Sequence, residues 1–174
     1  MSAKPLSVAI GSLAALLAAA PATAAVAAVG AVGFSLHIEI DSAREPAALW
    51  ARTVRPQDWW DSGHTYSNDA RNLSLALIPG GCWCEALPGG GFVRHMEVAY
   101  AAPGKALRLI GGLGPLQGMG VSGTLSFVMR PAAAGHTLLV VDYVVSGFAA
   151  KGFDELAKGV DAVLSEQIGR LAAP

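Results

Sequence analysis

Short apolar runs, separated by glycine and proline, fill the second half of the chain and precede one long amphipathic segment. Runs of this length with turn residues between them are typical of an antiparallel meander. The six runs are 73–78, 82–87, 92–100, 106–110, 123–130 and 137–145. From Phe153 to Leu171, apolar residues then recur every three or four positions, as they do on one face of a helix. A sheet that packs against one long helix would bury both apolar faces.

One more strand is expected before the meander. Residues 34–40 alternate between apolar and polar side chains, which predicts a strand with one buried face and with His37 exposed to solvent. Two short helices can follow, one starting near Pro46 and one near Pro56, because proline is tolerated in the first turn of a helix. The sequence therefore predicts an α+β fold, in which a seven-stranded curved antiparallel sheet wraps on a long C-terminal helix.

The N-terminus has the pattern of a secretory signal peptide. The first 36 residues carry a single charged side chain, Lys4, and an apolar stretch leads to an Ala-x-Ala sequence that ends at Ala24. We expect cleavage after Ala24 and a periplasmic or secreted location. The predicted division is a signal peptide at 1–24, a flexible Ala/Gly-rich N-terminus at 25–33 and one folded domain at 34–174.

Charge and hydropathy bear on two classes of partner, membranes and nucleic acid. The charge-free stretch continues to Phe34 and is longer than the roughly 20 residues that a spanning helix needs, so an uncleaved membrane anchor is the alternative to cleavage. A membrane is a partner only in that case. The net charge is -1, and no window holds a cluster of Lys or Arg, which argues against nucleic acid as a partner.

Three short motifs add a resemblance to this pattern. They are Ala-Ala-Leu-Trp at 47–50, Arg-Pro-Gln-Asp-Trp-Trp at 55–60 and Gly-Gly-Cys-Trp-Cys-Glu at 80–85. With the order of the elements, they resemble the START-like superfamily, also called SRPBCC, and its polyketide-cyclase and heat-shock-ATPase-activator-like branch. The resemblance implies a helix-grip fold with a cavity between sheet and helix that binds an apolar or amphipathic small molecule, in a carrier or sequestering role.

The resemblance also suggests where the cavity opens. Trp60, His64 and Tyr66 are expected at the polar side of its entrance, with Trp83 and Tyr143 deeper inside. His64 can be a ligand contact or a general base, or simply a surface histidine that bonds to local backbone. The glycine-rich stretch 111–120 lacks the Lys-Ser/Thr ending of a phosphate-binding loop, so we interpret it as a loop over the cavity or a long turn.

Cys82 and Cys84 admit three interpretations. On a strand their side chains share one face, and their Cα atoms would lie about 6.5 Å apart, near the upper limit for a disulfide. A bridge would need a local bend or bulge. The alternatives are two buried thiols, or a metal site completed by a histidine such as His64 or His95. We predict no metal and no cofactor.

The remaining polar residues in apolar strands have a default interpretation. Glu85 and Asp142 are expected to point outward and to pair with an arginine of a neighbouring strand, since an inward carboxylate would have a raised pKa. His95 and Glu97 are expected to pair on the solvent side.

The known catalytic motifs are absent from the sequence. It contains no Gly-x-Ser-x-Gly elbow, no His-Glu-x-x-His pair, no dinucleotide fingerprint and no Cys-x-x-Cys. The sequence thus leaves open whether the cavity only binds, or serves a cyclase- or isomerase-type enzyme. A cavity-free interaction domain is the third alternative.

Overall fold

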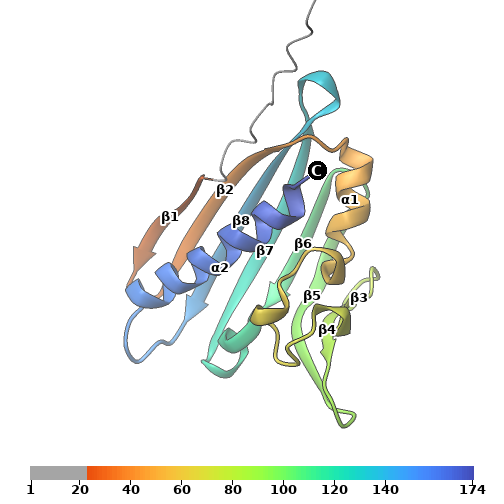
Figure 1. The fold of residues 1–174 in the computed structure, drawn as a ribbon. Coiled ribbons are helices and arrows are strands. Elements are labelled where there is room, and N and C mark those ends of the chain that lie inside the picture. The colour runs from red at the N-terminus through yellow and green to blue at the C-terminus, as the bar shows by residue number, and fades with distance from the viewer. Residues whose placement is uncertain (1–22) are drawn as a thin grey trace, which may run out of the picture.

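A computed structural model describes residues 23–174 (Figure 1). Eight antiparallel strands form one sheet in the order β1-β2-β8-β7-β6-β5-β4-β3. The strands are β1 Thr23–Gly30, β2 Gly33–Ser42, β3 Leu73–Leu75, β4 Cys82–Ala86, β5 Phe92–Ala102, β6 Ala106–Gly111, β7 Val121–Pro131 and β8 Thr137–Gly147. The helices are α1 Pro46–Thr53 and α2 Asp154–Ala172, with 3₁₀ turns η1 Pro56–Asp58, η2 Ser62–His64, η3 Ala70–Asn72, η4 Gly114–Gly118 and η5 Ala133–Gly135.

The sheet buries one face because its strands alternate. In β7 every second residue from Val121 to Met129 is buried, and β2 repeats this pattern with Phe34, Leu36 and Ile38. Strand β8 lies between β2 and β7 along its whole length. His37 is exposed on the other face, as predicted, and its Nδ1 lies 2.7 Å from Asp142.

The long helix α2 crosses the buried face of the sheet, over β1 and β2 (Figure 1). Leu164, Ile168 and Leu171 of the predicted apolar stripe are buried, and Leu156, Val160 and Val163 of the same stripe are partly buried. The helix-on-sheet prediction is therefore confirmed. Among residues 23–174, no helix is long and apolar enough to span a membrane.

The strand count is larger than predicted because residues 23–30 form β1. We expected a flexible segment at 25–33, and Ala and Gly have low strand propensity. Strand β1 instead pairs with β2 through a ladder in which Val26 lies opposite Leu36, and α2 packs across both strands. Backbone hydrogen bonds and the helix outweigh the weak propensity of these residues. The rest of the predicted signal peptide, residues 1–22, lies outside the described residues.

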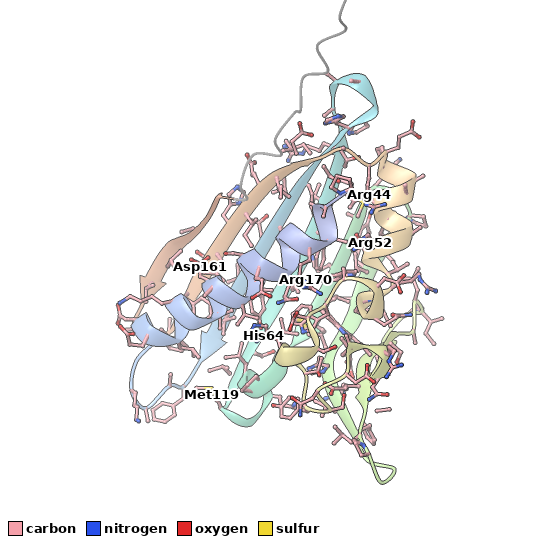
Figure 2. The ribbon with its side chains drawn as sticks, in the orientation of Figure 1. Arg44, Arg52, His64, Met119, Asp161 and Arg170 are labelled. Atoms are coloured by element: carbon pink, nitrogen blue, oxygen red, sulfur yellow. A yellow bond between two sulfur atoms is a disulfide. The ribbon has the colours of Figure 1, made fainter. Side chains whose placement is uncertain are left out.

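Two arginine side chains, one from α1 and one from the segment just before it, bind the C-terminal end of α2 (Figure 2). Arg44 Nε donates to the carbonyl of Ala173 at 2.8 Å, and Arg52 Nη2 donates to the carbonyl of Arg170 at 3.3 Å. Cations at a helix C-terminus bind the carbonyls that have no partner within the helix. Helix α2 is thereby fixed at one end, while its other end borders a cavity.

Candidate functional site

A cavity of about 470 Å³ lies between the N-terminal half of α2 and two loops, 60–66 and 113–119. Helix α2 supplies one face of residues, spaced so that all of them point to the same side. Most of the lining is apolar. The lining residues are Trp60, Gly63, His64, Thr65, Tyr66, Leu113, Gly114, Pro115, Leu116, Met119, Glu155, Leu156, Gly159, Val160, Val163 and Leu164.

The loop 60–66 is attached to α2 by polar contacts (Figure 2). The buried side chain of Gln167 accepts a 2.7 Å hydrogen bond from the backbone N–H of Asp61, and Arg170 pairs with the Asp61 carboxylate at 3.1 Å. Trp60 Nε1 donates to the carbonyl of His64 at 2.9 Å, which closes the loop on itself. These bonds hold the imidazole of His64 at the cavity rim, 3.4 Å from Glu166.

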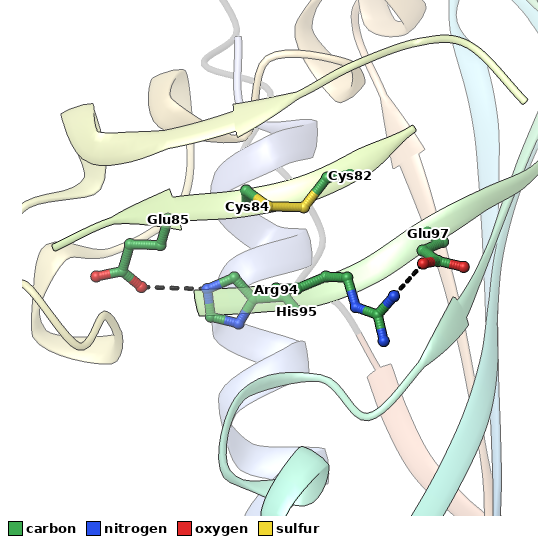
Figure 3. Close-up of a disulfide and its surroundings, with 6 residues drawn as sticks. All are labelled: Cys82, Cys84, Glu85, Arg94, His95 and Glu97. Atoms are coloured by element: carbon green, nitrogen blue, oxygen red, sulfur yellow. Dashed lines mark hydrogen bonds and ion pairs between the residues drawn. A yellow bond between two sulfur atoms is a disulfide. The ribbon is translucent and has the colours of Figure 1, made fainter. Parts of the chain in front are cut away.

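Glu85 attaches the same loop to the sheet (Figure 3). Its carboxylate is fully buried and accepts hydrogen bonds from the backbone N–H groups of Tyr66 at 3.2 Å and Ser67 at 2.5 Å, and from His95 Nε2 at 3.1 Å. Burial alone would raise the pKa of Glu85, but the hydrogen bonds outweigh burial and lower this pKa. Glu85 is therefore an ionised acceptor at neutral pH that positions the rim of the cavity.

The orientation predicted for Glu85 and His95 is wrong. Both point inward, and Glu97 pairs with Arg94 instead (Figure 3). Strand β5 carries an extra residue where its register with β4 shifts, because Trp83 lies opposite Met96 and Cys84 opposite Arg94. This bulge interrupts the alternation, so that His95 and Met96 are both buried. Burial lowers the pKa of His95 against the opposing effect of Glu85.

The structure joins Cys82 and Cys84 by a disulfide on the outer side of β4 (Figure 3). Their Cα atoms lie 5.2 Å apart, closer than in a regular strand. The irregular register at Trp83 and Cys84 provides the local bend that a bridge at this spacing requires. Of the three interpretations of the cysteines, the disulfide is the one that the structure contains.

Two predicted residues, Trp83 and Tyr143, lie behind the cavity and do not line it. Trp83 packs edge-to-face on Trp60, with ring centroids 5.2 Å apart, and so supports the wall from inside the core. The Tyr143 hydroxyl accepts a 3.4 Å hydrogen bond from the backbone N–H of Leu113, a lining residue. Burial raises the pKa of Tyr143 to about 12, so this phenol is neutral.

The structure thus brings Trp60, His64 and Tyr66 together at one cavity, and part of the stretch 111–120 forms its opposite side. The prediction places the cavity between sheet and helix, but it names no lining residue of α2, such as Glu155 or Val160. The sequence indicates these residues, because the apolar stripe of α2 includes Leu156, Val160 and Val163, which line the cavity and are only partly buried. The burial of Glu85 had a signal in the strand pattern, because Glu85 lies on the same face of β4 as Trp83, which was expected inside.

Comparison with known proteins defines the fold and no more. No family model matches the chain, and no curated protein matches it. Solved structures do match it. EF2215 of Enterococcus faecalis, a conserved protein of unknown function, has a TM-score of 0.59 at 16% identity over 87% of this chain and 74% of its own. CalU16 of Micromonospora echinospora has a TM-score of 0.54 at 12% identity over 87% and 81%.

A third similar structure is DynU16, a protein of the dynemicin biosynthetic locus. Its TM-score is 0.52 at 14% identity, over 79% of this chain and 45% of its own. At such identities the likeness shows a shared fold. These neighbours are compatible with the START-like fold that the sequence motifs suggest, and they carry no activity over to this chain.

Proposed function

We propose that the domain binds one apolar or amphipathic small molecule in the cavity under α2 and acts as its carrier or sequestering protein. The observation that carries the proposal is the cavity itself. It has the size of a site for a small organic molecule, and its walls are mostly apolar, with a few polar groups at the rim. An interaction domain without a cavity would fill this space with side chains.

Binding without chemistry is favoured over catalysis by the position of the titratable groups. His64 and Glu155 lie at the rim, and each pairs with a neighbour on α2, Glu166 and Lys158 respectively. The buried pair Glu85 and His95 lies behind the wall, where it holds the loop. The cyclase- or isomerase-type alternative would need His64 or Glu155 to give up its partner and to transfer a proton to or from a substrate atom.

Filling the cavity from α2 tests the proposal. Gly159 lines the cavity, and a Cβ atom built there meets no atom within 4 Å. We expect Gly159→Trp to weaken binding of the neutral fluorescent probe N-phenylnaphthylamine at least tenfold. The free energy of unfolding should hold or rise slightly, since glycine is the poorer helix former by about 0.5 kcal/mol.

Gly169→Trp is the matched control. Gly169 is also in α2, its Cβ position is also open, and it does not line the cavity. Titration of the probe against wild type and both variants should show loss of binding in Gly159→Trp alone. Equal binding by all three proteins, or binding by none, would overturn the proposal.

Replacing His64 separates a rim contact from a structural role. His64 is exposed and pairs with Glu166 only across a solvated surface, so such a pair contributes little stability. We expect His64→Ala to change the free energy of unfolding by less than about 0.5 kcal/mol while weakening probe binding several-fold. Denaturant unfolding and probe titration check this, and an equal loss in both would make His64 structural.

A further inference from the structure

We infer that the ligand of this cavity carries no negative charge, and that it is a neutral or cationic amphiphile whose polar end lies beside Glu155. This inference rests on the proposed function, because it names the class of molecule that the cavity would bind. It comes from the charges that line the cavity and from the partners of the charges nearby.

The residues that line the cavity offer few groups that could bind an anion. Its ionisable side chains are His64, Tyr66 and Glu155, and none of the lining residues is Lys or Arg. The backbone N–H groups of the loop are also engaged, since those of Tyr66 and Ser67 donate to Glu85 and that of Gly63 donates to Asp61. An anionic ligand group would therefore find no lysine or arginine in the lining and few free N–H donors in the loop 60–66.

Two cations of α2, Lys158 and Arg170, pair with acidic side chains. Lys158 Nζ lies 2.7 Å from Glu155, and Arg170 binds Asp61 and the carbonyl of Trp59. His64, the one lining group that can become positive, lies 3.4 Å from the carboxylate of Glu166. Each positive group would have to leave an acidic partner before it could bind a carboxylate or sulfonate of a ligand.

Because the cavity is mostly apolar, the loss of hydration disfavours an anionic ligand. An anion that enters an apolar cavity without a counter-ion or hydrogen bonds loses its hydration and gains little in return. A hydroxyl or amine at the same place can donate to the exposed Glu155 carboxylate while Lys158 stays bound, because a carboxylate accepts several hydrogen bonds. The half-exposed ring of Tyr66 offers a second surface suited to a cation.

Two probes that share one skeleton test the inference. N-phenylnaphthylamine is neutral, and anilinonaphthalene sulfonate adds one negative charge to the same rings. We expect wild type to bind the neutral probe at least tenfold more tightly. Glu155→Lys should reduce the ratio of the two dissociation constants at least threefold, because it puts a cation at the rim. The control Glu45→Lys makes the same charge change at the exposed start of α1 and should leave this ratio unchanged.

The outcomes separate the two proposals. If the sulfonate binds wild type as tightly as the neutral probe, and Gly159→Trp abolishes both, the cavity is a binding site but the inference on charge is wrong. The inference is also wrong if Glu155→Lys and Glu45→Lys have the same effect on the ratio of the two dissociation constants. If neither probe binds, the proposed function fails, and the inference fails with it.

Discussion

Glu85→Ala should lower the free energy of unfolding by about 3 kcal/mol. The substitution leaves three donors without an acceptor, namely the part-buried backbone N–H groups of Tyr66 and Ser67 and the buried Nε2–H of His95. It also removes the bond that joins the rim loop to β4. Probe binding should therefore weaken more than it does in a variant of the same stability that leaves the loop attached. Chemical denaturation and probe titration measure both effects.

Glu97→Ala is the control for this substitution. Glu97 lies on the neighbouring strand and pairs with Arg94 at the surface, so its loss should cost less than about 1 kcal/mol. Equal costs for the two variants would contradict the role assigned to the buried carboxylate.

The loss of stability in Glu85→Ala should depend on pH. The pKa of Glu85 is lowered in the folded protein, so its contribution is complete above the ordinary glutamate pKa of about 4.3 and is lost as the pH falls through the folded value. The stability difference between wild type and Glu85→Ala should therefore shrink below about pH 4. Taking the difference cancels the titration of distant groups. A difference that grows on acidification would contradict an ionised Glu85.

Gly123→Ala should cost about 2 kcal/mol of unfolding free energy and also distort the cavity wall. A Cβ atom at this position would lie 2.6 Å from the Tyr143 ring and 2.9 Å from the carbonyl oxygen of Val144. The ring is fully buried and cannot turn away without moving its neighbours. Its hydroxyl would then leave the N–H of Leu113, and the loop 113–119 would lose its anchor.

Gly30→Ala is a matched control, because Gly30 is also in a strand and a Cβ atom there meets nothing within 4 Å. Thermal or denaturant unfolding should show a loss in Gly123→Ala alone. Unfolding midpoints that fall equally in both variants would show that the loss comes from replacing a strand glycine and not from the contact with Tyr143.

The sequence predicts most of the fold because the apolar periodicity of its elements agrees with their structure. The stripe of α2 and the alternation of β2 and β7 are local patterns, and each is visible within one element. Strand β1 is different. Its Ala and Val residues form a strand only because β2 and α2 are beside it, and no local pattern reports such a partner.

The candidate site shows the same division. The rim residues Trp60, His64 and Tyr66 follow from their place in the chain order of the fold. The burial of His95 does not, because it depends on one extra residue in β5 that reverses the alternation. A bulge arises from the pairing of two strands, so the apolar pattern of one strand does not reveal it.

Native mass spectrometry of the protein purified from its own host tests the central claim most directly. We expect a fraction of the wild-type chains to carry one small-molecule adduct, which denaturation releases. Gly159→Trp prepared in the same way should lack the adduct, and Gly169→Trp should retain it. An adduct-free wild-type protein that also fails to bind N-phenylnaphthylamine would show that the domain is not a small-molecule carrier.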